Sequence, residues 1–252
     1  MILATNTYRK FDTCVELVKS AHKGDRKPDR TWVLDNSSGM FVRYLEDNNL
    51  NLETDLHNTQ VVIFPFNGGC AIAWNWLIKR ALHENPDEYI VISNDDITLH
   101  TDTLSLFEKA SIEHPGETVY VCGGIESPNA FSLYMVHPKT LIERVGLFDR
   151  QFKYPYCEDG DMQIRLWKAG LDLFRIPNCS VDHIGSATLK SFDQVETQQH
   201  HMRFLRNAQY LALKWGMYDH NNLHETTYNE PFNGDEDEKA LALSYLKSMF
   251  GE

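Results

Sequence analysis

Two carboxylates and an amide follow a short apolar run in the first half of the chain. Asn94, Asp95 and Asp96 come directly after residues 89–93, a run that is typical of a buried strand. Oxygen atoms of such side chains are the ligands that Mg²⁺ and Mn²⁺ prefer. A cation held there can neutralise the charge that a leaving diphosphate gains. Asn and Asp also favour plain polar turns, so this group alone leaves a turn open as the alternative.

A second acidic group begins a predicted helix over residues 158–169. Glu158 and Asp159 lie in its first turn, where an ionised carboxylate can act as a general base toward a hydroxyl group. Asp161 and Arg165 are four residues apart, so they share a helix face and can form an ion pair. Acidic side chains at this position also cap helices and interact favourably with the helix dipole, which is the structural alternative.

A histidine and a glycine-containing turn complete the candidate set. His183 ends a predicted strand over residues 179–183, and its neutral imidazole suits either a third metal ligand or a structural hydrogen bond. Asn67 and Gly68 precede a predicted helix over residues 70–82. Glycine lets a ligand approach the backbone and a helix N-terminus favours anions, although a tight turn uses the same residues.

The elements that must position these side chains alternate along the first half of the chain. Apolar runs alternate with helical spacing, which indicates a parallel sheet with helices on both faces. The predicted strands cover residues 2–5, 31–34, 61–66 and 89–93, and the predicted helices cover residues 11–21, 40–45, 70–82 and 103–112. Because ligands bind outside the carboxyl ends of such strands, the polar groups that follow them should meet in one crevice. These groups are Thr5-Asn6, Asp35-Asn36, Asn67-Gly68-Gly69 and residues 94–96.

The second half of the chain has a less regular alternation. Predicted strands cover residues 120–123, 131–136, 171–176 and 179–183, and predicted helices cover residues 138–145, 158–169 and 195–215. We therefore predict a nucleotide-binding half over residues 1–97 and an acceptor half over residues 98–216 that share one sheet. Residues 217–252 are predicted to form a polar loop followed by a closing helix.

Composition and charge restrict the classes of partner and compartment. The 252 residues include 24 Lys and Arg against 36 Asp and Glu, and the net charge of −12 argues against a general nucleic-acid-binding protein. No run of about 18 apolar residues predicts a membrane-spanning helix, and the N-terminus lacks the pattern of a signal peptide. Five widely separated cysteines fit a reducing compartment, so we expect a cytoplasmic protein, in the host cytoplasm if it is viral.

Sequence motifs of several common α/β enzymes are absent. The chain contains neither the glycine fingerprint of dinucleotide-binding folds nor the lysine-containing phosphate loop of nucleotide hydrolases. The nucleophile elbow of α/β hydrolases and the two-histidine helix of zinc proteases are also missing. These classes of enzyme are therefore unsupported by the sequence.

Taken in order, the motifs resemble those of the family 2 glycosyltransferases of the GT-A fold, in particular the rhamnosyltransferase-like branch. The resemblance runs over residues 2–216. Its most specific part consists of Phe148-Asp149, Glu158-Asp159-Gly160-Asp161 and Arg165. The other matching segments are Thr5 to Arg9, Trp32 to Ser38, Asn67 to Gly69 with Asn75, Asn94 to Asp96, His183, and Asn207, Tyr210 and Lys214 to Gly216. Two positions depart from the pattern, because Asn94 replaces an aspartate and Trp74 replaces an arginine.

The resemblance implies a role for each matching residue. Asp159 would take the proton of the acceptor hydroxyl, with Glu158 beside it. Asp96, helped by Asn94 and His183, would hold Mn²⁺ or Mg²⁺. Asp35 and Thr5 would contact the base and the ribose of the donor. The full set of residues expected to contact the nucleotide sugar is Thr5, Asn6, Tyr8, Asp35, Asn67, Gly68, Asn75, Asn94 and Asp95.

The activity implied by the resemblance is transfer of a sugar, with inversion, from a nucleotide diphosphate donor to a hydroxyl acceptor. A UDP-sugar is the favoured donor, and a polysaccharide, a protein or a small molecule all stay open as acceptors. One alternative is a virus-type enzyme that glycosylates hydroxymethylated bases in DNA. Its basic groove would consist of Lys139, Arg144, Arg150, Lys153 and Lys190. A nucleotidyltransferase and a non-catalytic nucleotide-sugar-binding module are the alternatives from other classes.

Overall fold

The computed structural model describes residues 1–123, 131–154, 156–185 and 192–215 of the chain. Its strands are β1 (Ile2–Thr7), β2 (Arg30–Asp35), β3 (Gln60–Ile63), β4 (Ile90–Asn94), β5 (Ile97–Leu99), β6 (Val119–Cys122), β7 (Leu133–Val136), β8 (Leu173–Ile176) and β9 (Val181–His183). Its helices are α1 (Phe11–Lys23), α2 (Met40–Asp47), α3 (Gly69–Glu84), α4 (Thr103–Glu113), α5 (Pro138–Arg144), α6 (Glu158–Lys168) and α7 (Gln194–Trp215). The loop and helix predicted for residues 217–252 lie outside the described residues.

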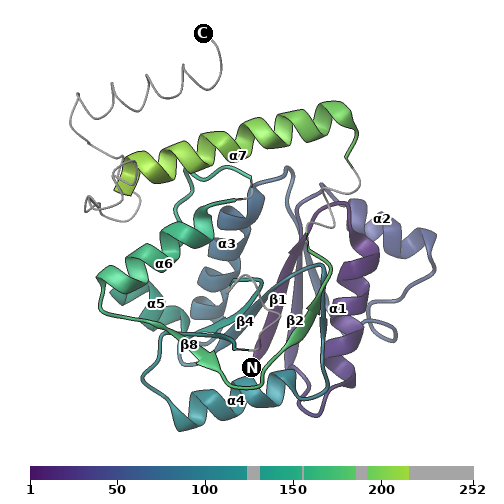
Figure 1. Ribbon diagram of the computed structural model, residues 1–252. Coiled ribbons are helices and arrows are strands. Elements are labelled where there is room, and N and C mark those ends of the chain that lie inside the picture. The colour runs from purple at the N-terminus through teal and green to yellow at the C-terminus, as the bar shows by residue number, and fades with distance from the viewer. Residues whose placement is uncertain (124–130, 155, 186–191, 216–252) are drawn as a thin grey trace.

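Seven strands form the central sheet, in the order β3-β2-β1-β4-β7-β6-β8. Strands β1 to β4 are parallel, as the alternation of strands and helices predicted, and β6 is parallel to β8. Strand β7 runs antiparallel to both of its neighbours, β4 and β6. The sheet is therefore mostly parallel, and both predicted halves of the chain contribute strands to it (Figure 1).

Helices cover both faces of the sheet, and alternate residues of each strand pack against them (Figure 1). Ile2 and Ala4 of β1 share a buried cluster with Leu77 of α3 on one face. Leu3 belongs to a cluster on the other face, together with Leu17 of α1. Strands that are buried on both sides need apolar residues at every position, which explains the uninterrupted apolar runs.

Four strands are shorter in the structure than predicted: β3, β7, β8 and β9, and β3 differs most from its prediction. The run over residues 61–66 was predicted to be extended throughout, but β3 ends at Ile63. Pro65 follows two residues later, and it has no N–H group with which to continue the ladder. The strand is therefore limited by its proline, and the segment after it turns toward α3.

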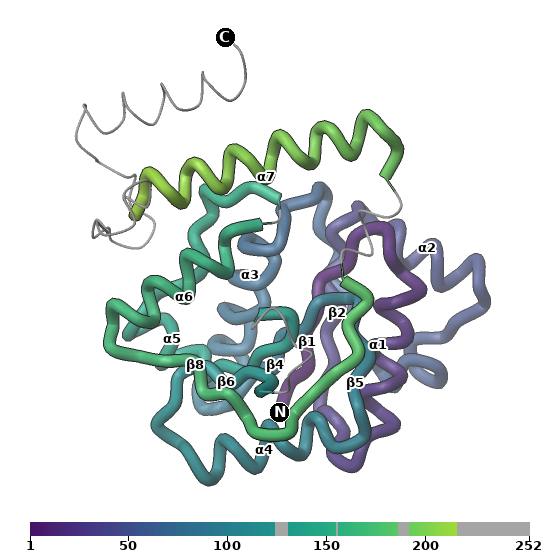
Figure 2. The backbone as a smooth tube through the Cα atoms, in the orientation of Figure 1, coloured from purple at the N-terminus to yellow at the C-terminus, as the bar shows by residue number. Residues whose placement is uncertain are grey.

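A small antiparallel sheet of β5 and β9 stands beside the carboxyl end of β4. The chain reaches β9 from β8 by crossing the molecule toward α1 (Figure 2). The N–H of Leu99 donates to Ser20 Oγ of α1 at 3.1 Å, which anchors the small sheet. Its register pairs Ile97 with His183, so that the histidine arrives next to the acidic residues after β4.

Helix α7 is 22 residues long and lies across one end of the molecule, above α3 and α6 in Figure 1. Asn207, Lys214 and Trp215 are buried against the rest of the fold, whereas Val195 and Met202 are exposed. Neither α7 nor any other helix in the described part of the chain combines the length and apolar character needed to cross a membrane.

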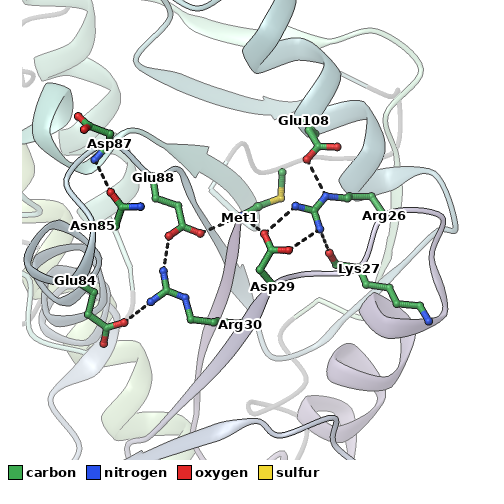
Figure 3. A network of polar contacts seen from close by, with 10 residues as sticks. All are labelled: Met1, Arg26, Lys27, Asp29, Arg30, Glu84, Asn85, Asp87, Glu88 and Glu108. Atoms are coloured by element: carbon green, nitrogen blue, oxygen red, sulfur yellow. Dashed lines mark hydrogen bonds and ion pairs between the residues drawn. The ribbon is translucent and has the colours of Figure 1, made fainter.

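The amino ends of β1 and β2 carry a network of ion pairs on the surface (Figure 3). Arg26 Nη2 lies 2.8 Å from Asp29 Oδ2. Arg30, at the start of β2, lies 2.5 Å from Glu84 Oε2 and also pairs with Glu88. At this end of the sheet, therefore, arginines of the protein balance the carboxylates that surround them.

Candidate functional site

The carboxyl ends of β1, β2 and β4 lie together at one edge of the sheet. The pairing register places Asn6 beside Asn94 and Thr7 beside Asp35. The N–H of Asn36 donates to Thr7 O at 3.0 Å, which fixes the chain as it leaves β2. The polar groups that follow these strands therefore meet at this edge, as the sequence led us to expect.

The turn before α3 is built from side-chain amides and a left-handed glycine. Asn36 Oδ1 accepts a hydrogen bond from the Gly68 N–H at 3.3 Å, and Asn67 Oδ1 accepts one from the Gly69 N–H at 2.9 Å. Gly69 has a φ of 77°, and a Cβ atom there would lie 2.8 Å from Tyr154 N. Both the backbone conformation and the close approach of this later segment therefore require glycine. The expected ligand contacts of Asn67 and Gly68 stay predictions.

The side chains of two residues expected to contact the nucleotide form hydrogen bonds within the protein. Thr5 Oγ1 donates to Ser93 O at 2.8 Å. The carboxylate of Asp35 is fully buried and accepts hydrogen bonds from the Ser37 N–H at 2.7 Å and the Phe41 N–H at 3.1 Å. The Ser37 hydroxyl also donates to it. These bonds hold the turn after β2 and the start of α2, and the nucleotide contacts of Thr5 and Asp35 stay predictions.

The side chain of Asn75, inside α3, also forms hydrogen bonds within the protein. Its Nδ2 donates to Phe148 O at 2.7 Å, and its Oδ1 accepts from the Phe148 N–H at 2.8 Å. These two bonds join α3 to the segment that precedes α6.

Asn6 and Tyr8 are half-buried at the edge of the sheet, and the Arg9 guanidinium lies 5.2 Å from the centre of the Tyr8 ring. Contacts of Asn6, Tyr8 and Asn75 with a nucleotide stay predictions.

Asp96 and His183, two of the predicted metal ligands, are adjacent. His183 Nε2 lies 3.0 Å from Asp96 Oδ1, and the N–H of Ile184 donates to Asp96 O at 3.1 Å. The two side chains are hydrogen-bonded to each other at this distance. Two atoms that bind one ion at about 2.1 Å and at a right angle also lie about 3 Å apart, so the same spacing fits a shared cation. The described residues contain no group of three or more His, Cys, Asp or Glu side chains placed to hold a metal. A cation bound here would need further ligands from a substrate or from water.

Asn94 and Asp95 occupy the turn between β4 and β5. The N–H of Asn94 donates to Ser132 O at 2.8 Å, which extends the pairing at the end of β4. Burial, with an added effect of the Asp96 charge, raises the pKa of Asp95 to about 7. A cation bound nearby would favour the ionised form of Asp95, so the electrostatics of this turn also suit a cation.

Glu158 and Asp159 begin α6, as predicted, and have different surroundings. Glu158 is buried, and its Oε2 has no hydrogen-bond partner among the described residues. Burial and the charge of Asp159 raise the pKa of Glu158 to about 8. Asp159 is half-buried, and its Oδ1 accepts a hydrogen bond from the Gly160 N–H at 2.8 Å. Glu158 is therefore protonated at neutral pH.

Cys70, in the first turn of α3, lies near both acidic groups. Burial raises the pKa of its thiol well above the ordinary value, and the charges of Glu158, Asp95 and Asp159 raise it further. The charges of these three carboxyl groups therefore all act on one thiol. Sequence reasoning missed Cys70, because a single cysteine in a helix has no distinguishing spacing. We call Asp95, Asp96, Glu158 and Asp159 the acidic edge.

A separate group of buried charges joins α6 to α7. Lys214 is fully buried, and its Nζ lies 2.7 Å from Asp149 Oδ2 and 2.8 Å from Asp161 Oδ1. Arg165 Nε donates to Asp161 Oδ2 at 2.9 Å, which confirms the ion pair predicted from their spacing. We call Asp149, Asp161, Arg165, Tyr210, Lys214 and Trp215 the Lys214 cluster.

Neutral donors complete the Lys214 cluster. The Tyr210 hydroxyl donates to Asp149 Oδ2 at 2.8 Å, and Trp215 Nε1 donates to Asp161 Oδ1 at 2.9 Å. Burial alone would raise the pKa of Asp149, but its bonds with Lys214 and its other partners hold that pKa below the ordinary value. Asp149 is therefore ionised, and both carboxyl groups of the cluster are hydrogen-bonded within the protein.

The basic residues expected for a DNA groove are only partly described. Lys139 and Arg144 lie exposed on α5, and Arg150 and Lys153 lie exposed in the segment before α6. Lys190 lies outside the described residues. The basic groove therefore stays a prediction.

Neither a protein-family model nor a curated protein matches this chain by sequence. Solved structures do match its fold. S. aureus TarS 1–349 in complex with UDP is 15% identical, with a TM-score of 0.57, and the match covers 100% of this chain and 72% of that one. The mannosyltransferase PcManGT from Pyrobaculum calidifontis, in complex with GDP-Man and Mn²⁺, is 17% identical with a TM-score of 0.58. That match covers 96% of this chain and 69% of PcManGT.

The TarS chain of another structure matches 99% of this chain with 15% identity and a TM-score of 0.58. This chain spans only 43% of the length of that TarS chain. Likeness at such low identity concerns the fold alone. The chain has the GT-A fold, a mostly parallel sheet with helices on both faces, as the sequence resemblance implied.

Proposed function

We propose that this protein is a metal-dependent glycosyltransferase that moves a sugar from a nucleotide diphosphate to a hydroxyl acceptor. The observation that supports the proposal is the contact of Asp96 with His183 just beyond β4, together with Asp159 in the first turn of α6, whose charge acts on the Cys70 thiol as that of Asp95 does. TarS holds UDP and PcManGT holds GDP-Man with Mn²⁺, which supports a nucleotide-sugar donor and Mn²⁺ for this chain. We extend the proposal to Mg²⁺ as an alternative cation and to a UDP-sugar as the favoured donor.

Asp96 and His183 would hold the cation, because their facing atoms are spaced as two ligands of one ion. When bound, the cation would offset the negative charge that the diphosphate gains as it leaves. Asn94 and Asp95 would contact the donor from the same turn. The backbone N–H groups at the start of α3 would face its phosphates, since a helix N-terminus favours anions.

Asp159 would remove the proton of the acceptor hydroxyl while its oxygen attacks the anomeric carbon. Attack from the side opposite the departing diphosphate inverts the configuration of that carbon. Without a bound cation, burial and the charge of Asp159 raise the pKa of Glu158 to about 8, so most Glu158 side chains are protonated at pH 7. The neutral carboxyl of Glu158 can donate a hydrogen bond, and we assign proton removal to Asp159.

The replacement Asp159→Asn tests this assignment, because a carboxamide cannot accept the proton. Release of UDP from UDP-GlcNAc, or of GDP from GDP-mannose, should fall by about 10²- to 10⁴-fold, while binding of the diphosphate with Mn²⁺ is retained. Asp172→Asn changes an exposed aspartate just beyond α6 and serves as the matched control. Turnover by Asp159→Asn at the rate of the unchanged protein would contradict the role of Asp159. Consumption of added pyrophosphate, with formation of UTP and GlcNAc 1-phosphate from UDP-GlcNAc, would instead indicate a nucleotidyltransferase, and donor binding without any release would indicate a binding module.

A further inference from the structure

The loop that leads into α6 is held in an unusual backbone conformation. We call residues 149–157 the 149–157 loop; residue 155 lies outside the described residues. Tyr154 and Cys157 have φ values of 64° and 75°, in the left-handed region that side-chain-bearing residues rarely adopt. Such conformations persist when surrounding contacts hold them in place. Cys157 immediately precedes Glu158 and Asp159, so the conformation of this loop sets where Asp159 lies.

One side of the 149–157 loop touches the turn before α3. A Cβ atom added to Gly69 would lie 2.8 Å from the nitrogen and 2.9 Å from the Cα atom of Tyr154. The two backbones are therefore in direct contact, without an intervening side chain. This contact joins the loop to the turn that we propose faces the phosphates of the donor.

The other side of the loop is held by α7. Asn207 is 3% exposed, and its Nδ2 donates to Lys153 O at 3.2 Å and to Tyr156 O at 2.9 Å. The guanidinium carbon of Arg203 lies 4.2 Å from the centre of the Tyr154 ring. A single buried amide thus bonds two carbonyl groups on either side of the left-handed residue Tyr154.

The contacts of α7 extend to both ends of the loop. Residues four and three apart lie along one face of a helix, and Arg203, Asn207, Tyr210 and Lys214 have this spacing. Tyr210 and Lys214 bind Asp149, where the loop begins, and Lys214 also binds Asp161, two residues beyond Asp159. One face of α7 therefore contacts the first residue of the loop, residues further along it, and Asp161 beyond it.

We propose that Asn207 is a positioning residue for Asp159, acting through the 149–157 loop. This proposal rests on the proposed role of Asp159 as the group that removes the acceptor proton. Loss of the Asn207 amide leaves two carbonyl groups without their donor and lets the loop leave its left-handed conformation. Asp159 then shifts from the acceptor, which slows the chemical step. The cation site of Asp96 and His183 lies on other elements, and the loop reaches the donor side only through its contact with the turn before α3, so the main effect is on the chemical step and donor binding changes little.

The replacement Asn207→Leu removes the amide while keeping the size of the side chain. Kinetics of diphosphate release from UDP-GlcNAc and GDP-mannose with MnCl₂, measured well below the unfolding temperature, should show kcat lower by about 10- to 100-fold. The donor KM should change by less than about twofold, since the lost interaction acts in the transition state. Gln198→Leu, an exposed position on the same helix, is the matched control and should change neither constant.

A role of Asn207 in stability alone predicts a lower unfolding temperature with an unchanged kcat, and that result would overturn the proposal. If Asn207→Leu does not fold, the variant Arg203→Met tests the proposal instead. This replacement should lower kcat about threefold at constant KM, because it removes one cation–π contact. An unchanged kcat in Arg203→Met would then overturn the proposal.

Absence of turnover with either donor would count against the proposed function and still leave the position of the loop testable. Hydrogen exchange then provides the readout, because the Asp161 N–H donates to Cys157 O at 3.0 Å. Asn207→Leu, or Arg203→Met in its place, should speed exchange at the start of α6 and leave the central strands unchanged. Equal exchange at the start of α6 in the variant and the unchanged protein would overturn the positioning role.

Discussion

The Lys214 cluster and the acidic edge both contain carboxyl groups from the first turn of α6. These groups differ in their hydrogen-bond partners, and the two regions shift carboxyl pKa values in opposite directions. Asp161 contacts Lys214, Arg165 and the Trp215 N–H, all within 2.9 Å. Glu158 lies three residues earlier in that first turn, and its Oε2 has no hydrogen-bond partner in the described part of the chain. The pKa of Asp149 is held below its ordinary value, whereas burial raises that of Glu158 to about 8.

This difference separates acids that hold the fold from acids that are available for chemistry. A buried charge is tolerated when a partner and hydrogen bonds satisfy it, as they do around Lys214. Asp95 and Glu158 are instead held in a setting that disfavours their ionised forms. Such perturbed carboxyls are typical of functional sites, and a cation bound at the acidic edge would favour their ionised forms. The comparison predicts opposite responses to mutation in the two regions.

The largest effect on stability is expected from Lys214→Met. This replacement leaves Asp149 and Asp161, which are at most 1% exposed, without their shared cation. Removing one partner of a buried ion pair costs about 3–5 kcal/mol, so the free energy of unfolding in urea should fall by that amount. Lys109→Met removes an exposed lysine and should change the unfolding free energy by less than about 0.5 kcal/mol. Equal stabilities of the two variants would show that the Lys214 cluster does not hold the fold.

The opposite sign is expected for Glu158→Gln in alkaline conditions. Because the pKa of Glu158 is about 8 in the folded protein against an ordinary value of 4.5, the folded state holds one more proton between these pH values. Stability therefore decreases as the pH rises through this window. Glutamine stays neutral, so the variant should match the unchanged protein near pH 4, be about 2 kcal/mol more stable near pH 6, and be more stable still near pH 8.5.

Urea unfolding at a series of pH values measures this effect. Glu113→Gln, at an exposed position, is the control that should follow the unchanged protein throughout. Parallel stability curves for Glu158→Gln and the unchanged protein would mean that Glu158 is ionised in the folded state. It would then compete with Asp159 as the proton-removing group.

The smallest effect is expected at the opposite end of the sheet, with Arg30→Gln. Arg30 pairs there with Glu84 and Glu88 in the surface network of Figure 3. Partly exposed pairs of this kind contribute up to about 1 kcal/mol, and salt weakens them. The loss of stability should therefore disappear in about 1 M NaCl, where the Debye length is about 3 Å. A loss of unfolding free energy as large as that of Lys214→Met would contradict the expected difference between the surface ion pairs and the Lys214 cluster.

Much of the fold is predictable from local sequence patterns. The alternation of apolar runs and helical spacing predicted β1 to β4 and their parallel arrangement, because each pattern reports on residues close in the chain. Strand β5 was missed, since its three residues are held by β9, which lies far later in the chain. The reversed direction of β7 was also missed, because an apolar run has no signal for the direction of its neighbours.

The candidate site is less predictable, because a residue type does not reveal how its side chain is used. Asp35 and Asn75 have the types expected for ligand contacts, yet their polar atoms bind the backbone of nearby segments. The sequence resemblance to family 2 glycosyltransferases included Lys214. Its burial between two carboxylates, however, depends on the packing of α6 against α7. Only the spacing of Asp161 and Arg165 gave a contact directly, since four residues span one helical turn.

Thermal unfolding with UDP and GDP, each with and without MnCl₂, tests the proposed cation and donor site most directly. The account predicts that one diphosphate stabilises the protein only when Mn²⁺ is present, by about 2.7 kcal/mol at a hundredfold excess over its dissociation constant. The same measurement on Asp96→Asn should show little or no Mn²⁺-dependent stabilisation. Absence of stabilisation in the unchanged protein, or an equal stabilisation in Asp96→Asn, would contradict a nucleotide diphosphate site at the acidic edge.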